Sequence, residues 1–337
     1  MNHTPHLLVI GVGSIGERHL RCFQSTNRCT LALCEPVEKR QKEVSDRYSV
    51  PGYSSWEEAI NKEVFSGAII ASPAPYHVPT ARALTEHGLD LLIEKPLSLS
   101  LEGIHELRAE VKSKGSKAAV GFVYRSLPAL RELREAACSG DFGRIVQVNI
   151  QAGQNFPFYR PAYREIYYAD PAMGGGLIQD MLPHPLNALE WIAGPTTRVV
   201  VDAEHQVLDG VEVEDTVHLL TRHRDVLGSI TVNQYQPVNE FVITVHCESA
   251  SLRWELQKHR WLIAREMGGD WEEQNSFHHE RDDFYTLQAN AFLDFLEGSA
   301  PPSCSLDAGI QTLQSTLAIL DSWKSQQWID VPPLPES

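Results

Sequence analysis

Residues 6–16 read His-Leu-Leu-Val-Ile-Gly-Val-Gly-Ser-Ile-Gly, an apolar run followed by glycines in the spacing G-x-G-x-x-G. The apolar run suits a short buried parallel strand, and residues 17–23 predict a helix. In such a strand–turn–helix unit the first glycine permits a tight turn, the second lets a pyrophosphate approach the backbone, and the third lets the helix pack on the strand. The N–H groups at the start of the helix then face the phosphates. The stretch therefore predicts a dinucleotide site that includes Gly11, Gly13, Ser14, Ile15 and Gly16.

An acidic residue in the expected place strengthens this prediction. A second predicted strand, residues 30–34, is followed by Glu35, which lies 19 residues after Gly16. A carboxylate at this point accepts hydrogen bonds from the adenosine ribose hydroxyls and repels a 2′-phosphate. The sequence therefore favours NAD over NADP, while Lys39 and Arg40 nearby keep NADP open as the alternative.

Strands and helices continue to alternate as far as residue 124. Predicted strands at 67–71, 90–93 and 117–123 are separated by predicted helices at 78–87 and 101–114. This alternation is typical of a doubly wound parallel sheet, which binds ligands at the carboxyl ends of its strands. The candidate cofactor and substrate residues at such ends are Ser72, Pro73, His77, Glu94, Lys95, Tyr124 and Arg125. For His77, a structural role and a cofactor-lining role stay equally open.

Lys95 directly follows a buried strand and is followed by Pro96, which constrains the direction of the backbone. A lysine beside the nicotinamide cation is favoured in its neutral form, because like charges repel, and it is then ready for proton transfer.

A second glycine-rich stretch, residues 174–184, reads Gly-Gly-Gly-Leu-Ile-Gln-Asp-Met-Leu-Pro-His. Its glycines allow a close backbone approach, and Asp180 and His184 follow them, four residues apart. Histidine titrates near neutral pH and suits removal of a hydroxyl proton during hydride transfer. Pro183 and Pro185 bracket His184, so we expect a new helix to begin near one of them, with Asp180 outside it.

The region around this stretch predicts a different architecture from the first 124 residues. Six runs of β-type residues between 199 and 265 favour a meandering antiparallel sheet, and helices are predicted at 281–297 and 306–323. Aromatic residues crowd the segment 156–168, in which Tyr163 and Arg164 are candidates for binding a substrate by stacking and hydrogen bonding. Packing within the loop or at a subunit contact is an equally open role for each aromatic side chain.

Taken together, these motifs resemble the Gfo/Idh/MocA oxidoreductase family. The resemblance is carried by the first glycine motif, by Ser72-Pro73 with His77, by Glu94-Lys95-Pro96, and by the glycine run with Asp180 and His184. It implies an NAD-binding Rossmann domain at 1–124 and, at 125–337, an α+β domain with a large, open, mostly antiparallel sheet. It also implies homodimers or homotetramers built through that sheet.

The resemblance implies an NAD-dependent dehydrogenase that acts on a sugar, inositol or related polyol. His184 is then the acid/base, with Lys95 and Asp180 binding and polarising the substrate. Two positions depart from the family pattern, which often has glycine at Leu182 and aspartate at Asn187. An NAD-dependent glycosidase without net redox change and a non-catalytic dinucleotide-binding sensor are the alternatives.

Composition limits the other classes of function. The formal net charge of −15 argues against nucleic acid or an anionic membrane as the main partner. The six cysteines show no zinc spacing, and residues 1–6 lack the basic start of a signal peptide, so we expect a cytoplasmic protein with free thiols. No metal is expected, because the cofactor supplies the electron sink; a metal bound by Asp180 and His184 is the minor alternative.

Overall fold

The structure, a computed structural model, describes residues 4–334. Residues 1–3, the start of the segment in which no signal peptide is expected, lie outside the described residues. The chain divides into two compact units, Met1–Ser126 with His279–Ile310, and Leu127–His278 with Gln311–Ser337. The expected division placed all of residues 125–337 in the second domain, whereas segment 279–310 belongs to the first unit.

The first unit contains a six-stranded sheet in the order β3-β2-β1-β4-β5-β6, with every pair of neighbours parallel. The strands are β1 (His6–Ile10), β2 (Thr30–Cys34), β3 (Gly52–Tyr53), β4 (Gly67–Ile70), β5 (Asp90–Ile93) and β6 (Ala118–Val120). The helices are α1 (Ser14–Ser25), α2 (Glu38–Tyr48), α3 (Trp56–Lys62), α4 (His77–Glu86), α5 (Ile104–Lys114) and α10 (Arg281–Glu297). The predicted doubly wound parallel sheet is confirmed. Because β1 lies between β2 and β4 in this sheet, its apolar run is buried.

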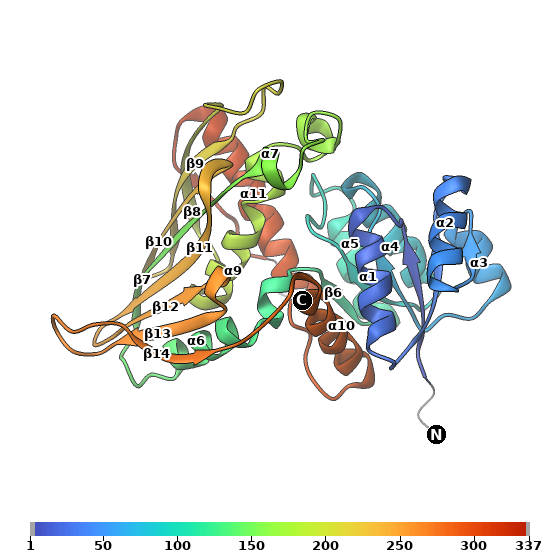
Figure 1. Ribbon diagram of the computed structural model, residues 1–337, viewed down its shortest axis with the longest axis horizontal. Coiled ribbons are helices and arrows are strands. Elements are labelled where there is room, and N and C mark those ends of the chain that lie inside the picture. Colours follow the sequence, from blue (N-terminus) through green and yellow to red (C-terminus); the bar gives the residue numbers. More distant parts are fainter. Residues whose placement is uncertain (1–3, 335–337) are drawn as a thin grey trace. The chain divides into compact units, whose positions relative to one another are not determined.

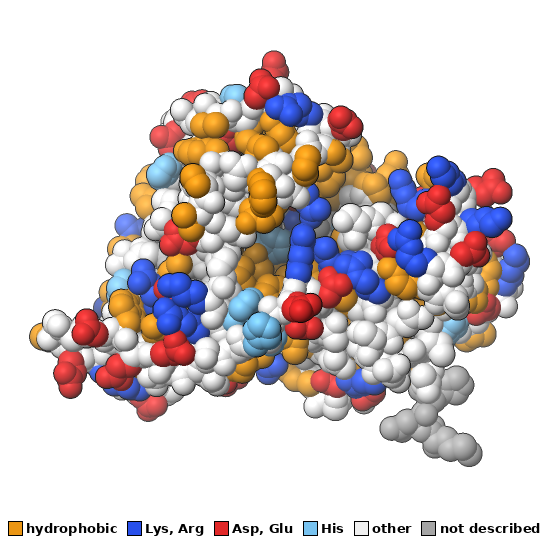
Figure 2. All heavy atoms as spheres, in the orientation of Figure 1, with side chains coloured by type: hydrophobic (Ala, Val, Ile, Leu, Met, Phe, Trp, Pro, Cys, Tyr) orange, Lys and Arg blue, Asp and Glu red, His pale blue; other side chains and the backbone are white. Residues whose placement is uncertain are grey.

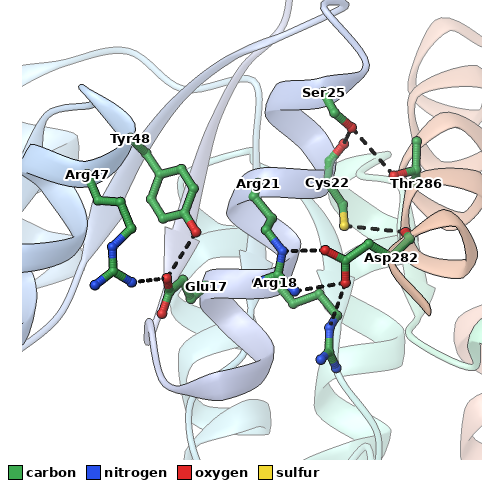
Figure 3. A network of polar contacts seen from close by, with 9 residues as sticks. All are labelled: Glu17, Arg18, Arg21, Cys22, Ser25, Arg47, Tyr48, Asp282 and Thr286. Atoms are coloured by element: carbon green, nitrogen blue, oxygen red, sulfur yellow. Dashed lines mark hydrogen bonds and ion pairs between the residues drawn. The ribbon is translucent and has the colours of Figure 1, made fainter. Parts of the chain in front are cut away.

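Helix α10 packs on α1, far from it in sequence. Phe292 of α10 meets Phe23 edge to face, with ring centroids 6.1 Å apart, in the main apolar core. The Asp282 carboxylate accepts hydrogen bonds from Arg18 at 3.2 Å and from Arg21 at 2.5 Å (Figure 3). Apolar burial and paired charge together place segment 279–310 with the Rossmann sheet.

The second unit contains a nine-stranded sheet in the order β14-β13-β12-β11-β7-β10-β9-β8-β15 (Figure 1). Only β7 and β10 pair in parallel among the described strands of this sheet. The strands are β7 (Ile145–Asn155), β8 (Arg198–Glu204), β9 (Thr216–His223), β10 (Val226–Asn233), β11 (Tyr235–Cys247), β12 (Ser251–Glu255), β13 (Arg260–Ala264), β14 (Glu272–Ser276) and β15 (Ile329–Asp330). The predicted large, mostly antiparallel sheet is confirmed.

Helices cover one face of this sheet. They include α6 (Pro128–Cys138), α9 (Pro183–Ala193) and α11 (Leu306–Ser325), and two short helices are α7 (Phe156–Tyr159) and α8 (Leu177–Asp180). Side chains of β9 alternate accordingly: Val217 and Leu219 are buried, whereas Leu220 is 51% exposed. The exposed positions of the strands lie on the opposite face.

Candidate active site

The glycine turn between β1 and α1 leaves space where the sequence predicts phosphate. A Cβ on Gly11, at φ +80°, would lie 2.9 Å from the Cα of Ser72, and a Cβ on Gly16 would lie 1.8 Å from the Gly11 carbonyl oxygen. Packing inside the protein therefore requires these two glycines. Around Gly13, in contrast, no atom of the described residues, apart from Gly13 and its two chain neighbours, lies within 4 Å of the ideal Cβ position. Glycine at 13 thus leaves room for a ligand and is not required by the protein's own packing.

The start of α1 provides the donors for such a ligand. Gly13 is the N-cap, so no side chain caps the first N–H groups of the helix, and Ser14 at its first position is exposed beside the half-buried Ile15. A helix N-terminus of this kind attracts phosphate. The hydroxyl oxygen of Ser72, next to Gly11, is buried and has no hydrogen-bond partner among the described residues. The turn therefore fits a pyrophosphate group.

The carboxylate of Glu35 is buried at the end of β2. Its two oxygens accept hydrogen bonds from the N–H groups of Val12 and Val37, both at 3.1 Å. A carboxylate has about four acceptor positions, so capacity remains for ribose hydroxyls. The half-exposed Arg40 lies 3.4 Å from the same carboxylate, so an anion-repelling and an anion-attracting group occupy the position that distinguishes NAD from NADP.

His77 connects the loops that follow β4 and β5. Its Nε2 lies 2.7 Å from the Ser72 carbonyl oxygen, and its Nδ1 lies 2.9 Å from the Pro96 carbonyl oxygen. Burial lowers the pKa of His77 more than these two carbonyl contacts raise it. The imidazole therefore positions the Ser72 loop and the Lys95–Pro96 segment. Pro73, the residue after Ser72, is exposed.

The side chain of Glu94, the residue before Lys95, is buried inside the first unit. One Glu94 oxygen lies 2.6 Å from Nε2 of His19, and the other accepts a hydrogen bond from the Lys95 backbone N–H at 2.9 Å. Burial acts to raise the pKa of Glu94, but the contact with His19 and the charge of Lys95 outweigh it and lower that pKa. His19 was missed in the sequence, although it follows Gly16 by only three residues.

Two tyrosines of the first unit, Tyr124 and Tyr285, lie within electrostatic range of Lys95. Burial raises the pKa values of Tyr124 and Tyr285, and the charge of Lys95 acts on both. Arg125, next to Tyr124, is buried. The sequence predicted Tyr124 and Arg125 at this strand end but contained no signal for Tyr285, which α10 brings there.

In the second unit the glycine run folds against Glu214. A Cβ on Gly176, at φ +87°, would lie 2.7 Å from the Glu214 carboxylate oxygens. That carboxylate accepts a hydrogen bond from the Ile178 N–H at 2.7 Å, and the Glu214 carbonyl accepts one from the Leu177 N–H at 3.1 Å. Burial raises the pKa of Glu214. Glu214, which no sequence pattern indicated, thereby holds the start of α8, the helix that ends at Asp180.

Asp180 and His184 lie in two different helices. Helix α8 ends at Asp180, and α9 begins at Pro183, which confirms the helix start expected from the prolines. Both side chains are half-buried. The Tyr167 hydroxyl donates a hydrogen bond to Oδ1 of Asp180 at 2.8 Å. This short segment therefore presents a carboxylate, a phenol and an imidazole that remain partly accessible.

The predicted substrate residues Tyr163 and Arg164 make contacts inside the second unit. The Tyr163 ring is buried in an apolar cluster, and its hydroxyl donates to the Asp209 carbonyl oxygen at 2.5 Å. Arg164 also donates to that oxygen, at 2.8 Å, and pairs with the Asp209 carboxylate at 3.1 Å. These contacts hold the loop around Asp209 and give no support to a substrate-binding role.

The aromatic segment does expose other rings. Figure 2 shows apolar side chains gathered on the surface over α7 and the loop that follows it. The exposed members are Phe158, Tyr159, Ile166 and Tyr167. Of these, Tyr167 is the one that hydrogen-bonds to Asp180.

The two departures from the family pattern are buried. Leu182 has no exposed surface. The Asn187 amide donates to the Thr312 hydroxyl at 2.9 Å, and Thr312 in turn donates to Glu190 at 2.6 Å. Asn187 therefore ties α9 to α11.

Among the helices of residues 4–334, none combines the length and apolar character needed to cross a bilayer. Within the same range, no group of three or more His, Cys, Asp and Glu side chains is arranged to hold a metal ion.

Both units match models of known domains. Residues 6–122 match the NAD-binding Rossmann fold of the GFO/IDH/MocA oxidoreductase family, and residues 130–253 match a GFO/IDH/MocA C-terminal domain.

Over the parts that align, the relatives are about a quarter identical to this chain. Inositol 2-dehydrogenase of Corynebacterium glutamicum is 27% identical over 59% of this chain and 57% of its own length. D-xylose 1-dehydrogenase (NADP(+)) 2 of Haloferax volcanii is 25% identical over 57% of this chain and 58% of its own. The rhizopine catabolism protein MocA of Rhizobium meliloti is 24% identical over 63% and 65%. In each case the match spans less than two thirds of the relative.

Solved structures show the same fold along nearly the whole chain. Levoglucosan dehydrogenase in complex with NADH has a TM-score of 0.89 at 19% identity and covers 98% of this chain and 100% of its own. An oxidoreductase from Agrobacterium radiobacter, in complex with NAD+, L-tartaric acid and magnesium, has a TM-score of 0.85 at 15% identity, covering 98% and 99%.

Proposed function

Because this chain belongs to the GFO/IDH/MocA oxidoreductase family, we propose that it is an NAD(P)-dependent dehydrogenase acting on a hydroxyl group of a sugar, inositol or related polyol. The observation that carries the proposal is the open position at Gly13, beside the uncapped start of α1 and the buried Glu35. Space, backbone donors and an acceptor for ribose occur together there, as a dinucleotide requires.

The residues proposed to hold the cofactor lie along the first unit. They are Gly11, Gly13, Ser14, Ile15, Gly16, Glu35, Ser72, Pro73 and Lys95, with His77 and Glu94 positioning the loops. When bound, the nicotinamide accepts the hydride. NAD is the proposed cofactor because Glu35 repels a 2′-phosphate, and Arg40 makes NADP the alternative.

Three side chains of the protein are assigned to the substrate. His184 takes the hydroxyl proton, since imidazole titrates near neutral pH. Asp180, with Tyr167 on one of its oxygens, holds a neighbouring hydroxyl. Lys95 donates a hydrogen bond to the oxygen that becomes a carbonyl. The names of the relatives, inositol and D-xylose dehydrogenases, support small polyhydroxylated substrates.

A homodimer or homotetramer through the uncovered face of the nine-stranded sheet is part of the proposal. Leu220 of β9 and Leu227 of β10 are 51% and 43% exposed, which favours burial in an assembly. Light scattering on the Leu220→Lys variant should give a smaller particle than wild type. An unchanged mass would exclude this face.

The activity is tested with purified protein, NAD or NADP, and a panel of inositols, aldoses and sugar acids. Formation of reduced cofactor with one group of polyols is expected. Release of a leaving group from glycosides without reduced cofactor would indicate the glycosidase alternative. Cofactor binding with no reaction on the whole panel would indicate a sensor.

A further inference from the structure

A histidine and a carboxylate are buried together, and the carboxylate belongs to Glu94, the residue before Lys95. The side chains of His19 and Glu94 are 0% and 6% exposed, and Nε2 lies 2.6 Å from Oε1. A Cβ on Gly121 would lie 3.0 Å from the same oxygen, so the carboxylate packs closely against the Gly121 backbone. Glu94 has so far been assigned only the positioning of the Lys95 loop, and His19 has been assigned no role in the proposed reaction.

The contacts of His19 determine how much charge the pair carries. Its Nδ1 is buried and has no hydrogen-bond partner among residues 4–334. A protonated imidazole would leave an N–H unsatisfied there, whereas a neutral ring that donates through Nε2 leaves only an acceptor. The Tyr285 ring meets the imidazole edge-on at 5.6 Å and fixes its plane. The pair therefore retains the negative charge of Glu94.

That charge acts on Lys95. The second Glu94 oxygen accepts the Lys95 backbone N–H at 2.9 Å, and the charge of Lys95 in turn favours the ionised carboxyl. Within the first unit the charge of Lys95 also acts on His77 from α4, Tyr124 from the β6 loop and Tyr285 from α10, while Arg281 faces Tyr124. Burial favours the neutral form of those three side chains. Of these four titratable neighbours, Glu94 is the anion.

We infer that Glu94, held by His19, is the positioning residue and counter-charge that keeps Lys95 protonated while the positively charged nicotinamide is bound. Lys95 then serves as a hydrogen-bond donor to the reacting oxygen, and the hydroxyl proton goes to His184. This assignment rests on the proposed function. It replaces the expectation that the cofactor's charge makes Lys95 neutral and ready to act as the base.

The direct test follows the charge of Lys95 in the wild-type protein. Lysines are reductively methylated with ¹³C, and the Lys95 resonance is identified by its loss in Lys95→Arg. Its position is recorded against pH with and without NAD. The resonance is expected to stay at its protonated position through neutral pH in both states. A change to the neutral position at neutral pH on adding NAD would overturn the inference.

Four variants assign the effect to the pair. Glu94→Gln keeps the shape but removes the charge, and the Lys95 titration should move down by about one pH unit or more. His19→Phe keeps the ring against Tyr285 but removes the donor, and should act in the same direction. His19→Gln, which retains a donor, should restore the wild-type curve. Asp90→Asn, at the opposite end of β5, is the matched control and should leave it unchanged. A wild-type curve in folded Glu94→Gln would contradict the role of Glu94.

These readouts need no substrate. If no polyol is oxidised, the proposed function fails while the Lys95 titration still decides the charge state. If polyols are oxidised but Lys95 loses its proton when NAD binds, only this inference fails.

Discussion

The Tyr167 hydroxyl donates a hydrogen bond of 2.8 Å to the Asp180 carboxylate, from a ring that is 50% exposed. The pair joins the exposed aromatic segment to the end of α8. A substrate hydroxyl that binds Asp180 therefore meets a carboxylate whose direction is already set by the phenol.

Tyr167→Phe should lower kcat/KM about tenfold, since a hydrogen bond to a charged group is worth about 1.5–3 kcal/mol before solvent exposure reduces it. Tyr159→Phe, in the same segment and 44% exposed, is the control and should behave like wild type. Steady-state kinetics on the best polyol checks both. Equal effects of the two substitutions would show that Tyr167 acts only through the surface of the loop.

Alanine substitutions at Gly16 and Gly13 should affect two different properties, stability and cofactor binding. Gly16→Ala places a methyl group 1.8 Å from a backbone oxygen, so it should lower the thermal unfolding temperature or prevent folding. Gly13→Ala meets no atom of the described protein within 4 Å, so it should leave that temperature nearly unchanged while weakening NAD binding about tenfold or more. Calorimetry and cofactor titration measure the two effects. Undiminished binding by Gly13→Ala would exclude phosphate from this position.

The individual strands, turns and helices could be predicted from the sequence because each depends mainly on residues that are neighbours in the chain. The apolar run and glycine spacing at 6–16 determine a strand, a turn and a helix, and the prolines beside His184 determine where α9 begins. Amphipathic spacing predicted α10 over the observed residues, 281–297. The spacing could not show that α10 packs on α1, because this packing depends on Phe23 and Arg21, which lie more than 250 residues earlier in the chain.

For the candidate site residues, the sequence indicated positions but not surroundings. Residue types and positions along the chain indicated Lys95, Asp180 and His184, but not the side chains that hold them. In the first unit His19 and Tyr285 pack together near Glu94, and in the second unit Glu214 holds the start of α8, through contacts between residues far apart in the chain. Tyr163 and Arg164 had the composition of sugar-binding residues, yet Asp209, 45 or 46 residues further on, takes up their polar groups.

Cofactor choice should depend on the charge of Glu35. Glu35→Gln removes the repulsion of a 2′-phosphate beside Arg40, so the ratio of the NADP to the NAD dissociation constant should fall about tenfold or more. Arg40→Gln should change the ratio in the opposite direction. Fluorescence titration with both cofactors measures the ratio. If wild type already prefers NADP, Glu35 does not determine the choice.

Stability should decrease in mild acid because of a buried imidazole in the second unit. Burial lowers the pKa of His223 to about 4, although its contact with the Gly194 carbonyl oxygen raises it. In the unfolded chain the ring titrates near 6.5, so between about pH 6.5 and 4 the unfolded state binds the proton first and the free energy of unfolding falls, by up to about 3 kcal/mol. The contribution of His223 to the free energy of unfolding is fully present above the pKa of histidine in the unfolded chain, about 6.5.

His223→Gln removes that titration, so denaturant unfolding of the variant should lose less stability than wild type between neutral pH and pH 5. The Gln side chain retains a donor for Gly194. Identical pH dependence in the two proteins would show that His223 does not contribute.

Hydride transfer from a polyol carbon to the nicotinamide can be followed with an isotope. A polyol substrate deuterated at the reacting carbon is incubated with the protein and NAD, and the reduced cofactor is analysed by mass spectrometry. The deuterium is expected to appear in the reduced nicotinamide, and His184→Ala is expected to slow its transfer while leaving NAD binding intact. Reduced cofactor without deuterium, or full transfer by His184→Ala, would contradict the proposed reaction.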